Sequence, residues 1–244
     1  MGKIEYSNAF QKYLVERKKE VASRIPFPWD YMQNKSRGIR KSTLYFIAGE
    51  KKNVMAVDMA LAFTNSSKKV AYISTSEIPE DVKNISGIAT CHTTSFEELQ
   101  AFVDSVNPDM LVVEDLQDFT LTAEDVANDE EVVQTGNQCV VPNTIGGRAY
   151  SLKRWVMDHH TTAIITMDMY DFEDPVGVSL DDFYDSIGWA SCAADMVIAL
   201  RKNHTNPNYY NVFVLKDRHC ASPPYHMVMR LDSPKEHFLD VQRS

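Results

Sequence analysis

The strongest constraint on the fold is a repeated alternation of short apolar runs with helical patterns between residues 44 and 200. Five of the apolar runs are predicted to be buried strands, because they are continuous rather than alternating. They are Leu44–Ala48, Val70–Ser74, Met110–Val113, Ala163–Met167 and Met196–Leu200. Strands of this kind are covered on both faces, so the pattern predicts an α/β fold with a mostly parallel sheet flanked by helices.

The segments between these strands contain apolar residues at three- and four-residue steps, which is typical of helices. The predicted helices are Val54–Phe63, a helix from Ser95 to about Val106, and Ile145–His159. Ser95 and Glu98 have the spacing of a capping box, which favours a helix start at this point. Two later runs, Tyr210–Leu215 and Met227–Leu231, are expected to complete the sheet as antiparallel strands.

The N-terminal segment is predicted to be a helix that precedes the main domain. Apolar residues recur at helical spacing over residues 3–23, and Ile25-Pro26-Phe27-Pro28 then ends the helix, because proline cannot continue it. We therefore expect a linker-type helix at 1–24 and a single domain at 25–244. The apolar stripe of the helix needs a surface to cover it. That surface is either its own domain or a neighbouring subunit.

Composition and charge narrow the class of protein. The chain has 244 residues, of which 44% are hydrophobic and 24% charged, as expected for a globular domain with a full core. Its net charge of −9 argues against coating of nucleic acid by bulk charge. The four cysteines lie far apart and indicate neither a zinc site nor a redox motif. With no secretory signal and no long apolar run, we expect a cytoplasmic protein without membrane contact.

Several segments resemble one protein family. The stretch GIRKSTLYFIAGEKKNVMAVDMAL, from Gly38 to Leu61, resembles the approach to the P-loop in RecA-fold ring helicases. Other stretches are similar to the bacterial replicative helicase DnaB and, more closely, to the replicative helicases of tailed phages. They are IPFPWDY at 25–31, KKVAYIS at 68–74, MLVVEDLQ at 110–117, SLDDFYDSIGWASCAADMVIAL at 179–200 and LKDR at 215–218. The resemblance covers roughly residues 25–231 and implies a RecA-like P-loop NTPase fold with an N-terminal helical arm.

The P-loop itself departs from the family pattern GxxxxGK[ST]. In that pattern the second glycine lets backbone N–H groups approach the phosphates, the lysine neutralises their charge and the hydroxyl binds Mg²⁺. Gly49 takes the first position, and the spacing then places Val54, Met55 and Ala56 at the last three. None of these side chains supplies the required function. We interpret the P-loop as degenerate and expect neither ATP nor Mg²⁺ as a cofactor, and no metal site.

Other charged residues near the expected site are interpreted as remnants. Lys51 and Lys52 lie inside the loop and are expected to be solvated, although a displaced lysine can act in deviant P-loops. The resemblance places the acid that holds the Mg²⁺ water shell at Glu114, with Asp115 beside it. It places the water-activating glutamate near Glu77, one residue out of register. We assign no confident catalytic residue.

Two further features bear on partners. Lys216 and Arg218 match the family's KxR pair, which reaches into the neighbouring subunit's active site as a trans finger; an ordinary basic pair on an edge strand is the alternative. The expected DNA-facing loop at 168–185 has seven acidic residues and no Lys or Arg, so it should repel DNA. The acidic segment at 119–143 is either a solvated loop or a partner-docking insert.

These features favour a catalytically degenerate RecA/DnaB-helicase-like protein, a pseudo-ATPase, that acts as a structural or regulatory partner in DNA replication or recombination. Its expected partner is a protein: a helicase, a recombinase or another copy in an oligomer. DNA contact is expected to be weak. Two alternatives stay open. One is an active ATP-dependent DNA helicase or recombinase subunit with a deviant P-loop, and the other is a protein-interaction module that no longer binds nucleic acid.

Overall fold

The structure is a computed structural model, and it describes residues 8–119, 145–169, 190–219, 224–233 and 235–241. Most of the acidic segments at 119–143 and 168–185 lies outside these residues. The described strands form one sheet in the order β3-β2-β4-β5-β1-β6-β7-β8-β9. The strands are β1 (Leu44–Gly49), β2 (Val70–Ser74), β3 (Ile88–His92), β4 (Met110–Val113), β5 (Thr162–Met167), β6 (Met196–Lys202), β7 (Tyr209–Asp217), β8 (Tyr225–Asp232) and β9 (His237–Asp240).

The sheet is parallel from β3 to β6 and antiparallel from β6 to β9. The described helices are α1 (Asn8–Ala22), α2 (Asp30–Ser36), α3 (Lys52–Asn65), α4 (Glu80–Lys83), α5 (Phe96–Val106), the 3-10 turn η1 (Leu116–Asp118) and α7 (Ile145–Asp158). Every strand and helix predicted over residues 44–231 is confirmed to within two residues, as are the mostly parallel sheet and its antiparallel end.

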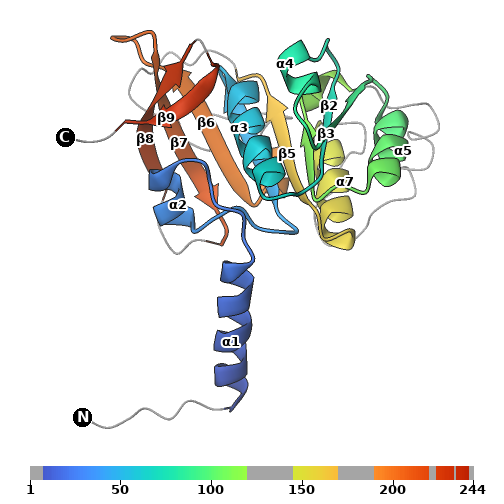
Figure 1. Cartoon of the computed structure of the whole chain (residues 1–244), viewed down its shortest axis with the longest axis vertical. Helices are drawn as coiled ribbons and strands as arrows, with labels where there is room; N and C mark the ends of the chain where they lie inside the picture. The colour runs from blue at the N-terminus through green and yellow to red at the C-terminus, as the bar shows by residue number, and fades with distance from the viewer. Residues whose placement is uncertain (1–7, 120–144, 170–189, 220–223, 234, 242–244) are drawn as a thin grey trace.

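Helices cover both faces of the sheet (Figure 1). Side chains alternate along each strand, so β1 contributes to two separate cores. Tyr45 and Ile47 pack in the cluster that contains Met59 of α3. Phe46, on the opposite face, packs in the cluster that contains Leu152 of α7. This two-sided burial explains why the parallel strands are continuous apolar runs.

The sequence patterns did not predict β3, β9, α2 or α4. Strand β3 lies at the edge of the sheet, and its residues Ile88–His92 are only partly buried or exposed, so it lacks a continuous apolar run. The helix start at Ser95 is confirmed, because its hydroxyl accepts a hydrogen bond from the Glu98 N–H at 3.3 Å. The Thr93 hydroxyl donates a hydrogen bond to the Glu98 carboxylate and accepts one from the Ser95 N–H at 3.0 Å.

Helix α1 extends away from the body of the molecule (Figure 1). Tyr13 and Val15 are 50% and 51% exposed. The chain rejoins the body through a short bridge, in which the Ile39 N–H donates to the Ile25 carbonyl at 2.7 Å. Tyr13 and Val15 are therefore not covered by the domain, whereas Val21, near the end of the helix, is partly buried. Among the described helices, none has the length and apolar character needed to cross a membrane.

Candidate functional site: the loop between β1 and α3

The loop that corresponds to the P-loop is very short. Strand β1 ends at Gly49 and α3 begins at Lys52, so only Glu50 and Lys51 connect them. Gly49 has a φ of 103°, and a Cβ at this position would lie 2.1 Å from the carbonyl oxygen of Leu200. Only glycine fits this close approach to β6. Lys51, directly before the helix, adopts a left-handed conformation with a φ of 58°.

Both connecting residues are tied to neighbouring segments. The Glu50 N–H donates to the Leu200 carbonyl at 3.3 Å, and the Lys202 N–H donates to the Glu50 carboxylate at 2.7 Å. Lys51 forms an ion pair with Glu236 at 3.2 Å, just before β9. The loop is thus held against the end of β6 and the residues just before β9. A phosphate cradle of the GxxxxG type has four residues between two glycines. Here only two residues separate β1 from α3, and no second glycine follows Gly49 in the loop.

Lys52 is buried in the first turn of α3 and is 9% exposed. Its Nζ lies 3.0 Å from Oδ1 of Asp115, and it also forms an ion pair with the carboxylate of Asp168. Burial acts to lower the pKa of Lys52, but these two carboxylates raise it overall, so the side chain is a firmly charged ammonium. The expectation of a solvated loop lysine at this position is wrong.

The residues that the motif spacing assigns to the end of the P-loop lie inside α3 instead. Met55 and Ala56 are fully buried in the core between α3 and the sheet, and Val54 packs against the same cluster. These residues lie inside the helix, because α3 begins two residues before Val54. The residues at the helix entry are Lys52 and Asn53, whose Oδ1 accepts a hydrogen bond from the Thr166 hydroxyl at 2.9 Å.

The two acidic residues after β4 have different environments. Glu114 is 3% exposed and accepts a hydrogen bond from the Tyr72 hydroxyl. Burial raises the pKa of Glu114 above its usual range. Asp115, at a φ of 51°, donates its N–H to Thr166 Oγ1 at 3.1 Å and directs its carboxylate to Lys52. Asp115 is therefore the acid that meets α3, and sequence reasoning had favoured Glu114. Glu77 is exposed, beyond the end of β2.

The electrostatic character of this region is acidic. Burial first, and then the negative charges of Asp115 and Asp168, raise the pKa of Asp118. Lys52 is the cation that acts against this increase. Within the described residues, no group of three or more His, Cys, Asp or Glu is arranged to hold a metal ion.

Lys216 and Arg218 lie at the end of β7, away from this loop. Lys216 Nζ donates to the carbonyls of Ser191 at 2.8 Å and Cys192 at 3.1 Å, and Arg218 Nη2 donates to the Cys192 carbonyl at 2.7 Å. Burial, followed by the charge of Arg218, lowers the pKa of Lys216. Arg218 remains about half exposed, at 48%.

Asp195 locates this pair relative to the loop. Its carboxylate accepts a hydrogen bond from the Leu44 N–H, at the start of β1, at 2.9 Å, and it lies 3.7 Å from Arg218. Lys52 follows the other end of β1. Six strand residues span about 20 Å, so Arg218 and Lys52 lie at opposite ends of the strands, with Arg218 at the N-terminal end of β1 and Lys52 beyond its C-terminal end. The chain does not bring its own basic pair to its own loop.

The C-terminal strand is attached to α3 by a buried carboxylate. Asp58 accepts hydrogen bonds from Nδ1 of His237 at 2.5 Å and from the N–H of Phe238 at 2.8 Å. Burial raises the pKa of Asp58 to about 6, and both hydrogen bonds oppose this change. The contact fixes β9 beside the helix that follows the loop.

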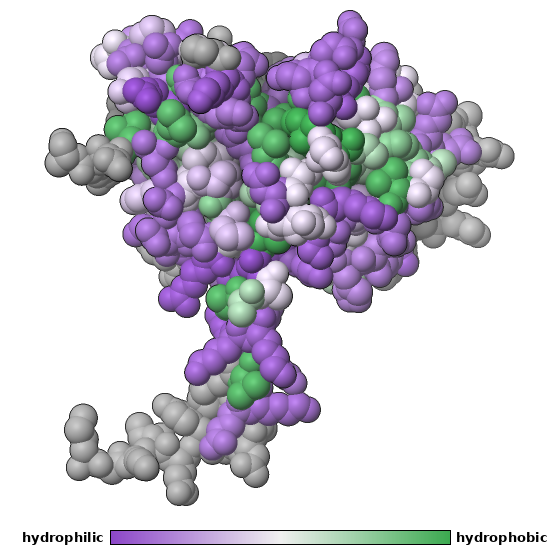
Figure 2. All heavy atoms as spheres, in the orientation of Figure 1, coloured by the Kyte–Doolittle hydropathy of each residue, from purple (hydrophilic) through white to green (hydrophobic). Residues whose placement is uncertain are grey.

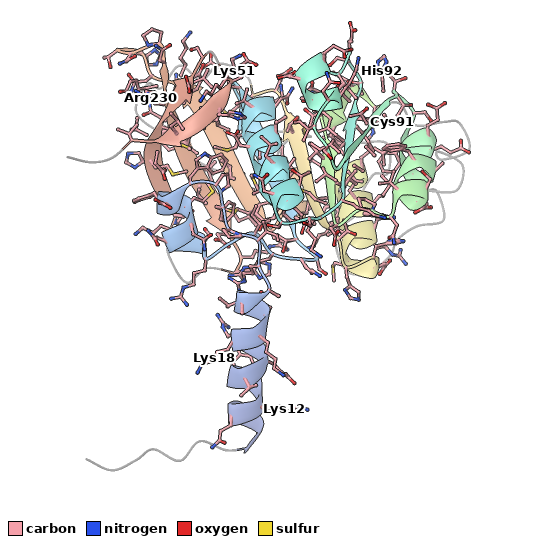
Figure 3. All side chains as sticks on the ribbon, viewed as in Figure 1. Lys12, Lys18, Lys51, Cys91, His92 and Arg230 are labelled. Carbon is pink, nitrogen blue, oxygen red and sulfur yellow. The ribbon has the colours of Figure 1, made fainter. Side chains whose placement is uncertain are left out.

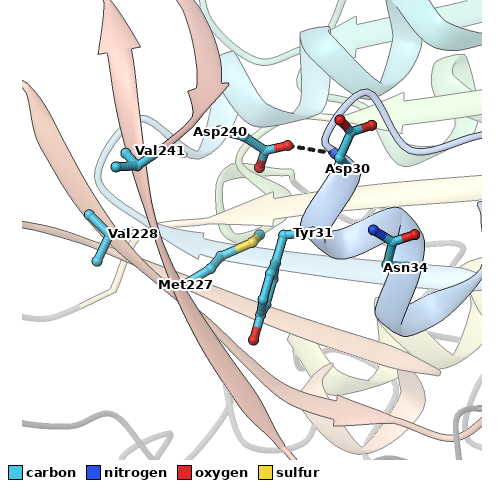
Figure 4. A pocket seen from close by; sticks show the side chains of 7 residues that line it. All are labelled: Asp30, Tyr31, Asn34, Met227, Val228, Asp240 and Val241. Carbon is cyan, nitrogen blue, oxygen red and sulfur yellow. Dashed lines mark hydrogen bonds between the residues drawn. The ribbon is translucent and has the colours of Figure 1, made fainter. Parts of the chain in front are cut away.

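A separate cavity of about 600 Å³ lies between α2 and the strands β8 and β9 (Figure 4). Its apolar wall includes Met227 and Tyr31, and its charged groups are Asp30 and Asp240. The Asp30 N–H donates to the Asp240 carboxylate at 2.5 Å. Two carboxylates disfavour a phosphate, so this cavity does not replace the P-loop as a nucleotide site.

Comparisons with known proteins identify the fold. The sequence matches no protein-family model and no curated protein. The structure is similar to a solved structure described as a DnaB-like replicative helicase and its interactions with primase, with a TM-score of 0.71, 13% sequence identity, and coverage of 98% of this chain and 68% of that one. It is also similar to a second solved structure, described as an ATPase domain, with a TM-score of 0.69, 13% identity, and coverage of 97% of this chain and 100% of that one. The chain therefore has the RecA-like α/β fold of DnaB-like helicase ATPase domains.

Proposed function

We propose that this chain is a catalytically degenerate RecA/DnaB-like protein, a pseudo-ATPase, that serves DNA replication or recombination as a structural or regulatory partner. The observation that carries the proposal is the position of Lys52. Its ammonium, at the entry to α3, is already neutralised by Asp115 and Asp168. In an active site of this fold a lysine near this position is needed for the phosphates of the nucleotide.

Binding of a triphosphate would require this arrangement to come apart. The phosphates would compete with Asp115 and Asp168 for Lys52, and the displaced carboxylates would then face the nucleotide. A like-charge contact at 4 Å costs about 4 kcal/mol at the effective dielectric constant of a protein surface. The acidic surroundings therefore oppose nucleotide binding, and the two-residue connection offers few backbone N–H groups to offset this repulsion.

The residues present also do not fit a magnesium ion held with a nucleotide. The family pattern places a Ser or Thr hydroxyl directly after the lysine. Asn53 follows Lys52, and its side-chain oxygen Oδ1 accepts a hydrogen bond from the Thr166 hydroxyl. Glu114, which the resemblance assigned to the Mg²⁺ water shell, is buried against Tyr72. We therefore derive no hydrolytic step for this chain.

Features that support a partner role lie outside this loop. Helix α1 extends from the body, and its described side chains from Gln11 to Glu20 are exposed, so it is available to a second molecule. The Lys216–Arg218 pair lies at the opposite end of the strands from the loop, where it can face a neighbouring subunit. One structural neighbour is described with its primase interactions. A DnaB-type helicase, a recombinase or another copy of the chain is the class of partner that we propose.

Lys52 also supports a second candidate function. A lysine at the first turn of the helix after β1, close to an aspartate after β4, is an element of an active P-loop enzyme. An ATP-driven helicase subunit with a shortened loop would use it. This candidate predicts ATP hydrolysis that single-stranded DNA stimulates and that Lys52→Met abolishes.

A titration with a fluorescent ATP analogue, with and without Mg²⁺, separates the two candidates. The pseudo-ATPase predicts no saturable binding at micromolar analogue and no hydrolysis at high protein concentration. Lys52→Met provides the matched control, because it removes the ammonium in question. Mg²⁺-dependent micromolar binding that is lost in Lys52→Met would establish the active enzyme and refute the pseudo-ATPase.

A further inference from the structure

Charge is strongly segregated along this chain. Residues 8–41 contain nine Lys and Arg against three Asp and Glu, a net charge of +6. The whole chain has a net charge of −9, so the remaining residues carry −15. The segment 8–41 comprises α1 and the connection to β1. Within this segment α1 itself carries +2, from Lys12, Arg17, Lys18 and Lys19 against Glu16 and Glu20, and the remaining +4 lies on the part of the segment that joins the body.

The length of α1 places the cations at its far end away from the body of the molecule. A helix of 15 residues is about 22 Å long, whereas the Debye length at physiological salt is about 8 Å. The far end of the arm therefore lies beyond most of the field of the acidic body. Lys12 is 79% exposed, and Arg17, Lys18 and Lys19 are also exposed. Lys12 and Lys18 extend from opposite sides of α1 (Figure 3).

The positive charge continues onto the edge of the body where α1 is attached. Arg37 and Lys41 are exposed beside the bridge that connects the arm. Arg40 donates from Nη2 to the carbonyl of His219 at 2.9 Å. Burial, and then the charge of Arg24, lowers the pKa of Arg40, as expected where cations are crowded. The arm and this edge form one basic surface in the described structure.

The neighbouring cations on the same edge gather around one buried carboxylate. Asp195 forms ion pairs with Lys153 and, at 3.7 Å, with Arg218. His219 Nε2 lies 3.9 Å from the same carboxylate. Burial first, and then the charge of Arg40, lowers the pKa of His219. Lys153 and Arg218 are thus the cations beside Asp195, whereas the lowered pKa of His219 leaves that ring neutral at pH 7. Asp217 is a second carboxylate near Arg40 and His219, and Arg37, Arg40, Lys41, Lys153 and Arg218 outnumber the two carboxylates.

We propose that α1 and this edge of the body form a nucleic-acid-binding surface that holds the phosphate backbone without reading the base sequence. Phosphates follow one another along a strand and match cations spread along an arm and an edge. Tyr13, half exposed with the Arg17 guanidinium 6.0 Å from its ring centre, adds a surface on which a base can stack. The location differs from residues 168–185, the acidic segment at which the resemblance would place the DNA contact.

Nucleic acid fits this surface better than an acidic protein does. A protein interface needs a cluster of apolar anchors at its centre. The surface around α1 is predominantly hydrophilic, with isolated apolar positions (Figure 2). The large apolar side chains exposed on its described part are Tyr13 and Val15. The inference goes beyond the proposed function, because phosphate binding by the arm requires no nucleotide.

The test measures fluorescence anisotropy of a labelled 30-base-pair duplex and a labelled 30-nucleotide single strand with the full chain, between 50 and 200 mM NaCl. The arm variant is Lys12→Gln/Arg17→Gln/Lys18→Gln/Lys19→Gln, in which glutamine preserves helix propensity. The matched control removes four exposed lysines of the body, Lys69→Gln/Lys83→Gln/Lys202→Gln/Lys235→Gln. Lys18→Gln/Lys19→Gln is an intermediate variant. Native mass is measured for each, and no ATP is added.

We expect the wild type to bind both DNAs with a steep salt dependence. In the arm variant, log K for duplex DNA against log salt should flatten by about 3 to 4, because each phosphate contact contributes about 0.9. The intermediate variant should show about half of this change and the control little. Absence of wild-type binding at 50 mM NaCl, or equal losses in arm variant and control, overturns the inference. A fall in assembled mass with unchanged DNA affinity also overturns it, because α1 would then be a contact between copies.

Discussion

Lys52, in the first turn of α3, forms an ion pair with Asp115, the second of two carboxylates that follow β4, at 3.0 Å. The pair joins the entry of the helix to the carboxyl end of a central strand. This is the position at which RecA-like ATPases handle phosphate charge, and here an internal contact satisfies the lysine. The contact underlies the proposed loss of ATPase chemistry.

Gly49→Ala should destabilise the protein strongly. The new Cβ would lie 2.1 Å from the Leu200 carbonyl oxygen, and alanine does not tolerate a φ of 103°. We expect a loss of about 3 kcal/mol or more in the free energy of unfolding, measured by urea denaturation. Gly87→Ala is the matched control, because Gly87 has a φ of 89° but its Cβ would be 3.3 Å from the nearest atom, a Thr64 side-chain carbon. Equal losses in both variants would show that the approach to β6 is not the cause.

Asp58 should make the stability of the protein depend on pH between about 4 and 6. Its pKa rises from 3.8 to about 6 in the folded state, so the folded protein binds the proton more tightly than the unfolded chain. The contribution of this group to stability therefore falls as pH rises through this window.

The variant Asp58→Asn removes this titration. Its free energy of unfolding relative to the wild type should increase by about 2 to 3 kcal/mol between pH 4 and pH 6, a shift of roughly two pKa units. Urea denaturation at several pH values measures the difference. Asp232→Asn, another carboxylate beside β9, serves as the control. A stability difference between Asp58→Asn and the wild type that stays constant across the window contradicts the assignment.

Asp195→Ala should be severely destabilising. The buried carboxylate accepts the Leu44 N–H and pairs with Lys153, so its removal leaves a buried donor and a half-buried cation without their partner. Loss of one member of a buried pair costs about 3 to 5 kcal/mol. Asp158→Ala, at the exposed end of α7, should change stability by less than about 0.5 kcal/mol. A small effect of Asp195→Ala in thermal and urea denaturation would refute its role as the organising anion of this edge.

Deletion of residues 1–22 should leave the stability of the body unchanged. The described side chains of α1 from Gln11 to Glu20 are exposed, and Tyr13 and Val15 are half exposed. We expect the free energy of unfolding to stay within about 0.5 kcal/mol of the full chain. If the arm packs on a neighbouring copy, native mass will fall in the same variant. A loss of stability at concentrations where the full chain is monomeric would show that the arm packs on its own domain.

The sequence patterns predicted the central architecture because the parallel strands, such as Val70–Ser74 and Met110–Val113, are buried on both faces and therefore apolar throughout. Strand β3 was not predicted from the sequence, because this edge strand contains Thr90, Cys91 and His92 and therefore has no continuous apolar run. The short β9 is held by the buried Asp58, a contact between residues far apart in the sequence.

The candidate site was harder to predict, because a motif spacing measured from Gly49 assumes a loop of standard length. With only two connecting residues, Lys52 and Asn53 take the helix entry and Met55 moves into the core. One signal was available in the sequence. The polar run Glu50-Lys51-Lys52-Asn53 ends where the apolar helix pattern begins, which places its last residues at the helix entry. The pairing of Lys52 with Asp115 depends on tertiary structure and has no local signature.

Native mass spectrometry of the purified chain, after incubation with millimolar Mg²⁺ and ATP, tests the central claim most directly. The account predicts that each species has a mass equal to a multiple of the 27.7 kDa chain, with no added nucleotide, and that Lys52→Met gives the same result. One ATP or ADP with Mg²⁺ per chain in the wild type, and none in Lys52→Met, would contradict the account and show that the shortened loop still binds nucleotide.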